Sequence, residues 1–246
     1  VYLGYDGLNR HVWTALSSNG NNALASYFYD GGSNGIGRLT SETFASGPSQ
    51  SVTGSYQYSY DARGRLTQDI ITIAGAGQTF STGYNDADQP TTLTYGDGSL
   101  LTTTYDTNDW LNSVSLNQGG TNTSLLDTLV YQAEPGASGL PTSANFGADT
   151  YQWTATYDAD LRLAADNVTT RTSQVPAGSV TEDYCYDQVY HLTWAGSQGT
   201  IPASCGGGSI TSTFAPYAQS FSYDTLDRLT SGPAGTYTYG DSSHLD

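Results

Sequence analysis

The sequence predicts an all-β protein built from repeated hairpins. Three observations carry this prediction: a recurring Tyr-Asp pair, runs in which tyrosines alternate with polar residues, and clusters of Gly, Pro, Asn and Ser between these runs. An alternation of period two places side chains on one face of a strand, and the clusters are typical of turns. The nearest approach to helical periodicity, at residues 125–129, is weakened by its threonine and flanking glycines.

The Tyr-Asp pair marks a repeat that runs through the chain. Seven intact and three degenerate copies have a mean spacing of about 26 residues, a period typical of repeat architectures. The intact copies are Tyr5-Asp6, Tyr29-Asp30, Tyr60-Asp61, Tyr105-Asp106, Tyr157-Asp158, Tyr186-Asp187 and Tyr223-Asp224. The degenerate copies are Tyr84-Asn85, Tyr131-Gln132 and Tyr239-Gly240. We therefore expect residues 1–246 to form one continuous array of about ten units.

A large side chain follows most of these pairs after three further residues. Trp110 and His191 occupy that position in two repeats, and a Gly-rich insertion after Asp30 delays it in a third. Arginine occupies it in five repeats, as Arg10, Arg38, Arg65, Arg162 and Arg228. Five of the seven arginines in the chain thus belong to one repeat position.

One unit is interpreted as a β-hairpin. Tyrosines at period two in residues 55–60 predict a strand, and residues 65–73 predict the returning strand. Between them Asp61 can accept a hydrogen bond from its own backbone two residues on, and Gly64 can adopt the left-handed conformation of a tight turn. Because each hairpin can bury a face only against its neighbours, the expected architecture is a spiralling antiparallel sheet that closes into a tube or shell.

Composition limits the possible partners. Only 12% of residues are charged and the net charge is −16, with no lysine, so neither a nucleic-acid nor an anionic-membrane surface can be built. No apolar run is long enough for a transmembrane helix, and the first residues do not resemble a signal peptide. Aliphatic residues are scarce, so most of the 20 tyrosines and 4 tryptophans are expected to be buried, with arginines over their rings.

The motif Tyr-Asp-x-x-x-Arg-Leu resembles the YD repeat of the Rhs/YD-repeat family. Tyr95-Gly96-Asp97-Gly98 is a degenerate relative of the same motif, and the resemblance extends from Tyr5 to Tyr239. The members of the Rhs/YD-repeat family include Rhs proteins, wall-associated bacterial proteins, teneurins and the encapsulating components of Tc toxins. The resemblance implies a sheet wound into a hollow cocoon, extracellular or secreted, which in several relatives encloses a toxic C-terminal domain. The Asp-Pro autoproteolysis signature of the family has no match here, and we expect a segment of a longer array or a stacking unit.

In an extracellular repeat protein, Cys185 and Cys205 are expected to form a disulfide that staples a long hairpin extension. Two independent buried thiols are the alternative. Because no His–Cys cluster accompanies them, we expect no zinc site.

Catalytic and ligand-binding patterns are weak. Ser33 lies in a Gly-x-Ser-x-Gly match, but inside the Gly-rich insertion, where the strand and helix of a hydrolase elbow are not expected. The three histidines, His11, His191 and His244, are expected to pack on tyrosines rather than to bind metal or act as bases. The acidic turn at residues 85–88 could bind Ca²⁺ but lacks the spacing of a calcium loop. We therefore expect no cofactor and no metal.

These observations favour a non-catalytic structural protein of the cell surface. It would form a wall that stacks end to end into a filament or encloses polypeptide cargo, with adjoining repeats or further copies as partners. The alternative is an adhesion module in which exposed aromatics bind glycans, and a remote alternative is a serine hydrolase at Ser33. Two sequons, at Asn122 and Asn167, permit glycosylation without demanding it.

Overall fold

The computed structural model describes residues 1–46, 52–132, 139–170, 178–212 and 216–239. The chain divides into two compact units, Val1–Thr123 and Ser124–Asp246. In the described ranges the regular structure consists of strands and one three-residue 3-10 helix, so the all-β prediction is confirmed. The same ranges contain no helix with the length and apolar character needed to cross a membrane.

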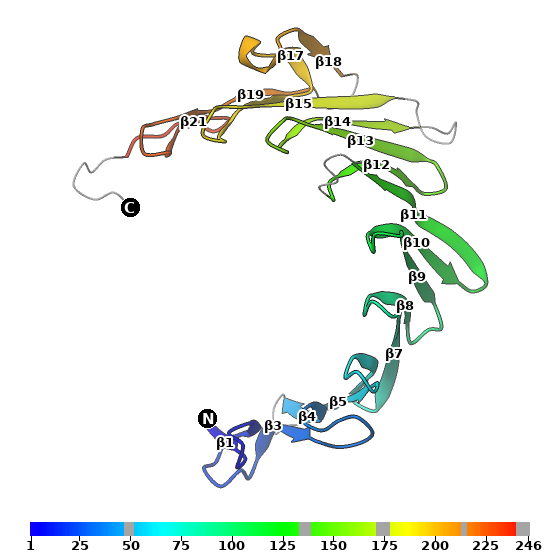
Figure 1. Ribbon diagram of the computed structural model, residues 1–246. Coiled ribbons are helices and arrows are strands. Elements are labelled where there is room, and N and C mark those ends of the chain that lie inside the picture. Colours follow the sequence, from blue (N-terminus) through cyan, green and yellow to red (C-terminus); the bar gives the residue numbers. More distant parts are fainter. Residues whose placement is uncertain (47–51, 133–138, 171–177, 213–215, 240–246) are drawn as a thin grey trace. The chain divides into compact units, whose positions relative to one another are not determined.

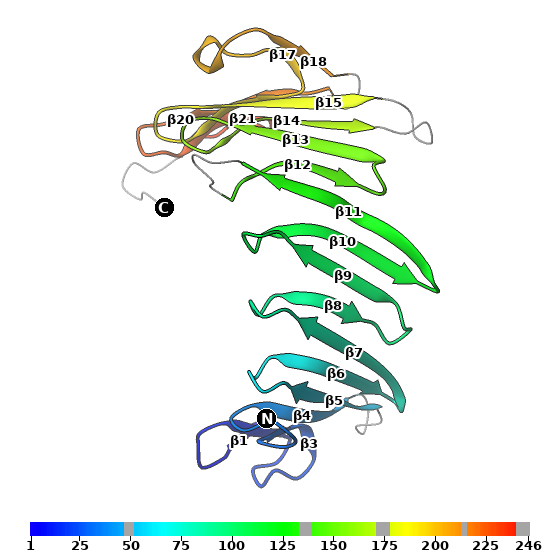
Figure 2. The same ribbon diagram turned by 45° about the vertical axis from the view of Figure 1, so that its right-hand side comes forward.

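The first unit is an antiparallel meander in which each strand pairs with the next along the chain (Figures 1 and 2). Its strands are β1 (Tyr2–Tyr5), β2 (His11–Ala15), β3 (Ala23–Tyr29), β4 (Leu39–Ser46), β5 (Val52–Tyr60), β6 (Leu66–Ile73), β7 (Ala76–Tyr84), β8 (Pro90–Thr94), β9 (Leu100–Tyr105) and β10 (Leu111–Gln118). The Tyr-Asp turns follow the odd-numbered strands of this unit. Because successive strands reverse direction, these turns all lie on the same side of the sheet, at the carboxyl ends of the odd-numbered strands.

The second unit continues the same design and adds an insertion. Its main strands also pair in antiparallel succession. They are β11 (Thr121–Tyr131), which begins at the end of the first unit, β12 (Pro141–Phe146), β13 (Tyr151–Tyr157), β14 (Leu163–Thr170), β15 (Ser179–Tyr186), β16 (Leu192–Gly196) and β19 (Ala218–Ser220). The insertion carries β17 (Gln198–Thr200), the 3-10 helix η2 (Ala203–Cys205) and β18 (Ser209–Thr211), and the last hairpin carries β20 (Ser222–Tyr223), β21 (Leu229–Gly232) and β22 (Gly235–Thr236).

A β-bulge at the repeat tyrosine recurs along both units. In the repeat at Tyr60, the register shifts between Ser59 and Tyr60, so that Tyr60 pairs with Leu66, the residue after the repeat arginine. Tyr5, Tyr29, Tyr84, Tyr105, Tyr131, Tyr157, Tyr186 and Tyr223 pair with the corresponding residue of their own hairpins. A bulge bends a strand and increases its twist. The repeat therefore bends the sheet at regular intervals.

The two faces of the first unit differ in chemistry. Register and alternation place one set of apolar, aromatic and acidic side chains on one face, which we call the aromatic face. This face comprises Glu42, Phe44, Tyr56, Tyr58, Asp69, Ile71, Phe80, Leu93, Leu101 and Leu116. The other face, the hydroxyl face, carries mainly Ser, Thr and Gln, including Thr43, Ser55, Thr72, Thr92 and Thr102. The sheet is thus amphipathic, as expected of a sheet that has only one face covered.

The expectation that the tyrosines are buried was wrong for the described residues. Their buried apolar side chains are four alanines, Leu126, Cys185, Trp194 and Ile210, and no tyrosine is among them. Most tyrosines are half-buried instead. The reason is that the meander of the first unit is one layer thick, so a ring on it is covered by neighbours in the sheet but by no second layer.

Candidate functional site: the repeat turns

The turn after Tyr60 is held together by hydrogen bonds to the Asp61 carboxylate. Asp61 Oδ1 accepts hydrogen bonds from the backbone N–H groups of Arg63 and Arg65, at 2.9 and 3.0 Å. Its other oxygen, Oδ2, accepts from Nε of Arg65 at 2.6 Å. The Asp61 N–H in turn donates to the Arg65 carbonyl at 3.0 Å and closes the loop. One carboxylate therefore satisfies two backbone donors and one charged side chain.

The same bonds recur in turns of both units. Five further aspartates and one asparagine accept from the N–H groups two and four residues on. They are Asp6, Asn85, Asp106, Asp158, Asp187 and Asp224. Asp30 departs from the pattern, because the Gly-rich insertion brings the N–H of Gly37 to its Oδ1 instead, at 2.6 Å. The turn chemistry expected at Asp61 is therefore present in six further described turns.

The residue before the arginine position adopts a left-handed backbone conformation. Gly64 does so with φ of 82°, as expected from its sequence. Asn, Asp or Gly occupy the position in most repeats, as Asn9, Gly37, Asp88, Asp109, Gly139 and Asp227. Leu161 and Tyr190 occupy it with φ of 63° and 74°. Bulky side chains are disfavoured in this region, so these two turns carry backbone strain.

The repeat arginine connects its own turn to the next one. Arg65 binds Asp61 through Nε, while its Nη1 donates to the Asn85 carbonyl at 2.9 Å and to Asp88 at 2.7 Å. Its guanidinium lies 4.7 Å from the centroid of the Tyr84 ring. Arg10 and Arg162 make equivalent contacts to the next turn and its tyrosine. The expected arginine–tyrosine contacts are thus present, and each arginine spans two repeats.

A second connection runs through the tyrosine hydroxyls. Tyr60 Oη donates to the carbonyl of Leu39 at 2.6 Å, and Tyr84 Oη donates to that of Leu66 at 2.7 Å. Both acceptors are the first residue after the large-side-chain position of the preceding repeat. The same bond is made by Tyr29, Tyr105, Tyr157, Tyr223 and Tyr239. We refer to the arginine and tyrosine connections together as the repeat ladder.

The ladder shifts the titration of its carboxyl groups. The backbone N–H of Arg65, opposed by desolvation and aided by the Arg65 side chain, lowers the pKa of Asp61. The same balance of donors and desolvation lowers the pKa values of Asp6 and Asp224. Burial has the opposite effect on Tyr60, whose pKa it raises. These aspartates are held in the charged form that the turn requires.

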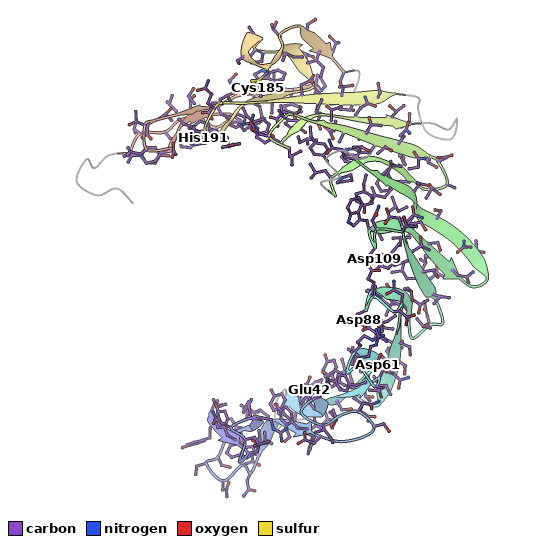
Figure 3. The ribbon with its side chains drawn as sticks, in the orientation of Figure 1. Glu42, Asp61, Asp88, Asp109, Cys185 and His191 are labelled. Atoms are coloured by element: carbon purple, nitrogen blue, oxygen red, sulfur yellow. A yellow bond between two sulfur atoms is a disulfide. The ribbon has the colours of Figure 1, made fainter. Side chains whose placement is uncertain are left out.

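Histidine can replace arginine in the ladder. His191 Nδ1 lies 3.0 Å from Asp187 Oδ2, and its ring stacks on Tyr223 with centroids 4.3 Å apart. His11 lies 4.8 Å from the Tyr27 ring by centroids. Figure 3 shows His191 in the second unit and the turn aspartates Asp61, Asp88 and Asp109 in the first. The third histidine, His244, lies outside the described residues.

The disulfide between Cys185 and Cys205 is confirmed, with Cα atoms 5.6 Å apart. It joins strand β15 to the insertion formed by residues 197–212, which we call the flap. Cys185, Trp194 and Ile210 form a small buried cluster against which Ile201 and Cys205 pack. Ser212 holds the flap further by exchanging hydrogen bonds with the backbone of Thr181. The stapled extension expected from the sequence is therefore a flap that packs Ile210 against Cys185 and Trp194 of the sheet.

The remaining candidate sites of the sequence do not assemble. Ser33 lies between strands β3 and β4, so the strand–turn–helix of a hydrolase elbow is not formed there. In the acidic turn at residues 85–88, Asp88 binds Arg63 and Arg65 and Asn85 closes the turn, so both side chains are already engaged. Within the described ranges no group of three or more His, Cys, Asp or Glu could hold a metal ion.

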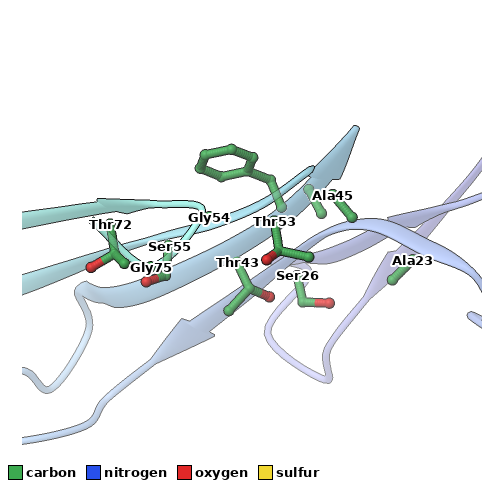
Figure 4. Close-up of a pocket in the computed structure, with 11 residues that line it drawn as sticks. Ala23, Ser26, Thr43, Ala45, Thr53, Gly54, Ser55, Thr72 and Gly75 are labelled. Carbon is green, nitrogen blue, oxygen red and sulfur yellow. The ribbon is translucent and has the colours of Figure 1, made fainter. Parts of the chain in front are cut away.

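A hollow of about 460 Å³ lies on strands β3 to β6 (Figure 4). Its lining mixes hydroxyl-bearing side chains, such as Ser26, Thr43 and Thr72, with alanines, glycines and Phe44. Its described lining holds no charged or titratable group, so it offers no acid–base chemistry.

Sequence reasoning did not find two groups of carboxylates that lie in strands rather than in turns. Glu42 accepts a hydrogen bond from Tyr58 Oη at 3.3 Å, and Asp69 pairs across strands with Tyr58. In the second unit Asp166 accepts from Tyr184 Oη at 3.3 Å and from Trp153 Nε1 at 3.0 Å. An acidic residue at a strand position otherwise occupied by apolar side chains is the signal that could have identified them.

Comparison with known proteins agrees with this geometry. Residues 34–130 match the family model of the teneurin YD-shell. No curated protein is a significant sequence match for the chain. Among solved structures, the TcdB2–TccC3 complex is similar over 96% of this chain, with 15% identity and a TM-score of 0.59. The TcdB2–TccC3–Cdc42 complex gives a TM-score of 0.57 and the Photorhabdus luminescens Tc holotoxin pore gives 0.59, each at 15% identity and 96% coverage of this chain.

Fold and turns together define an antiparallel β-sheet protein built from repeats, in which the recurring side chains of one unit bond to the next unit. Over residues 34–130 the chain resembles the YD-shell of the Rhs/YD-repeat family, as its Tyr-Asp turns predicted, and the Tc toxin structures share its fold. It spans only 14–15% of the length of the three solved chains it resembles.

Proposed function

We propose that this chain is part of the non-catalytic wall of a β-sheet shell that encloses polypeptide cargo outside the cell. The observation that carries the proposal is the repeat ladder, which uses the charged side chains of the repeat to join hairpin to hairpin. The similarity to Tc toxin structures over 96% of the chain supports it. The absence of an assembled catalytic constellation in the described residues agrees with a structural role.

The amphipathic first unit gives a physical reason for closure. A single sheet leaves its aromatic face without a second layer, and the exposure of apolar side chains to water costs free energy. Winding the sheet into a tube turns that face inward, where opposite walls or cargo cover it. The hydroxyl face then forms the outside, where Ser, Thr and Gln are readily hydrated.

We propose further that residues 1–246 form one continuous array that is a segment of a longer shell, with adjoining repeats as its partners. Each arginine and tyrosine of the ladder reaches into a neighbouring repeat, so a terminal hairpin is completed by another hairpin. The chain's 14–15% share of the Tc toxin chains agrees with this arrangement. End-to-end stacking into a filament is the competing use of the same ladder.

Protease protection tests enclosure. The full-length protein that contains these repeats would be treated with a nonspecific protease in its native state, and the fragments would be identified by mass spectrometry. Enclosure predicts that a segment outside the repeat array survives together with the shell, and that it is degraded once the shell is opened with denaturant. A segment degraded at once in the native protein would contradict enclosure, and filaments seen by negative-stain microscopy would favour stacking.

A further inference from the structure

One position of the repeat ladder carries a histidine. In the turn at residues 187–191, His191 occupies the position that arginine occupies in five repeats. Its Nδ1 lies 3.0 Å from Asp187 Oδ2 of the same turn, and its Nε2 lies 3.5 Å from Asp227 Oδ1 of the following turn. Its ring stacks on Tyr223 with centroids 4.3 Å apart. Each nitrogen of the ring therefore faces a carboxylate of a different turn.

The partners of His191 occupy the same repeat positions as the partners of Arg65. Arg65 binds Asp61 of its own turn, Asp88 of the following turn and the ring of Tyr84. Asp88 and Asp227 each lie three residues after the first residue of their turns, and both have a left-handed backbone, with φ of 65° and 62°. The two connections are thus built alike, but arginine is always charged, whereas the charge of histidine depends on pH.

The two nitrogens of His191 cannot both donate when the ring is neutral. A neutral imidazole has one N–H and an imidazolium has two. With its N–H on Nδ1, neutral His191 donates to Asp187 and presents the lone pair of Nε2 to the Asp227 carboxylate. Protonated His191 keeps the first bond, now charge-assisted, and forms an ion pair with Asp227. Protonation therefore completes the connection between the two turns.

Asp187 is charged in the pH range where histidine titrates. Desolvation raises its pKa, but hydrogen bonds from the backbone N–H groups of His191 and Val189 and from the His191 side chain lower the pKa of Asp187 overall. The proton that this connection gains in acid therefore resides on the imidazole rather than on the Asp187 carboxylate.

The surroundings of His191 allow this change of charge. Its side chain is 20% exposed, so water reaches it. The titratable and charged groups around it are Asp187 and Tyr190 in its own turn, Tyr223, Asp224, Asp227 and Arg228 in the following hairpin, and Arg162 in the preceding turn. Arg228 is paired with Asp224, and Arg162 is paired with Asp158. Among the described ion pairs, the partner of Asp227 is His191.

We propose that His191 is a pH-dependent connection, which holds the hairpin of β20 and β21 to the turn between β15 and β16 more tightly in acid than at neutral pH. Histidine changes its charge between pH 5 and pH 8, so the ion pair with Asp227 is present below that range and is lost as pH rises through it. The connections made by arginine do not change over the same range.

Loss of the ion pair should loosen this hairpin without detaching it. Tyr223 Oη also donates to the carbonyl of Leu192 at 3.0 Å, and this bond does not depend on the charge of His191. The expected response is therefore a more frequent local opening of β20 and β21 at neutral pH. The inference does not depend on enclosure of cargo, because both turns belong to the second compact unit.

Hydrogen–deuterium exchange of the full chain tests the inference. Exchange would be followed by mass spectrometry in peptides that cover β20 and β21, and each variant would be compared with the parent protein at the same pH, so that the intrinsic effect of pH on exchange cancels. Asp227→Asn removes the charge and keeps a residue that tolerates the left-handed backbone. It should accelerate exchange of this hairpin about threefold at pH 5.5, as expected of a partly exposed ion pair, and leave it within about 1.5-fold at pH 7.5.

His191→Arg makes the charge permanent. Relative to the parent protein, it should slow exchange of the same hairpin about threefold at pH 7.5 and leave it nearly unchanged at pH 5.5. His11→Gln, which alters a histidine of the first unit, is the control and should have no effect on this hairpin at either pH. Circular dichroism would establish that every variant is folded.

Two results would overturn the inference. If Asp227→Asn changed exchange equally at both pH values, or at neither, the contact with Asp227 would not depend on the proton of His191. If His191→Arg left exchange at pH 7.5 unchanged, a permanent charge at this position would not hold the hairpin. Neither result would bear on whether the shell encloses cargo.

Discussion

Tyr60 Oη donates a hydrogen bond of 2.6 Å to the carbonyl oxygen of Leu39, and this bond joins two successive repeats across the sheet. Tyr60→Phe removes the donor and leaves the ring in place. A typical buried hydrogen bond contributes about 1 kcal/mol, so the free energy of unfolding should fall by about that amount. Urea denaturation measures the change.

The matched control is Tyr151→Phe, because Tyr151 is an exposed tyrosine that belongs to no repeat turn. Its stability should stay within about 0.5 kcal/mol of the parent protein, as for most surface substitutions. Equal losses in the two variants would contradict the role given to the Tyr60 bond.

Asp61 should make stability depend on pH. The Arg65 N–H and side chain lower its pKa in the folded protein, so the stabilisation is fully present above the unfolded-state pKa of about 4 and is lost as pH falls through the folded value. Asp61→Asn should therefore lower the melting temperature at neutral pH. In acid, the melting temperatures of the variant and the parent protein should become more similar. Asp86→Asn, at an exposed turn position, is the control. If the melting temperatures of Asp61→Asn and the parent protein differed by the same amount at every pH, ionisation of Asp61 would not be coupled to stability.

Asp69 should act in the opposite direction. Burial raises its pKa, so the folded protein binds the proton more tightly than the unfolded chain and stability falls as pH rises from about 4 through the folded value. Asp69→Asn should then raise the melting temperature at neutral pH, and this gain should shrink in acid. Thermal melts of both proteins across the acid range measure the effect. A lower melting temperature at neutral pH would mean that the ionised carboxylate stabilises the fold.

Leu161 offers a stabilising substitution. Its backbone is left-handed with φ of 63°, and its side chain is 50% exposed, so little packing is lost when it is removed. Leu161→Gly should raise the free energy of unfolding by about 1 kcal/mol, the cost of the left-handed conformation for an L residue less the entropy cost of glycine. Leu161→Asn should also stabilise. Tyr190→Gly is the contrast, since Tyr190 contacts Arg162 at 4.9 Å and its loss offsets the relief of strain.

The disulfide should contribute measurably to the free energy of unfolding of the second unit. Cys185 and Cys205 are separated by 20 residues, and closing a loop of that length stabilises by roughly 3 kcal/mol in the chain-entropy model. Replacing both cysteines by alanine, or adding a reductant to the parent protein, should remove that amount. The reductant should leave the alanine variant unchanged, and an effect on that variant would show that reduction acts elsewhere.

Much of the turn chemistry could be predicted from the sequence because it is local. Asp61, Gly64 and Arg65 lie within five residues, and their hydrogen bonds follow from side-chain type and spacing. The arginine position was also visible, since five of the seven arginines share it. These contacts needed no knowledge of how distant parts of the chain meet.

The remaining features depend on pairing between strands. The bulge at each repeat tyrosine fixes which residue it pairs with, and the sequence does not reveal that register. For the same reason the strand carboxylates were missed: Glu42 and Asp69 are 27 positions apart in the sequence, and strand pairing places both beside Tyr58. The burial of tyrosines was overestimated because composition reports a need for apolar area but not the number of layers that supply it.

In the function that we propose, the repeat ladder builds the wall of a closed, hollow shell around polypeptide cargo. Cryo-electron microscopy of the full-length protein that contains these repeats tests it most directly. We expect a continuous β-sheet wall with the aromatic face of β4 to β7 turned inward and with density for polypeptide inside. An open sheet, a filament without a lumen, or a shell with the hydroxyl face turned inward would contradict it.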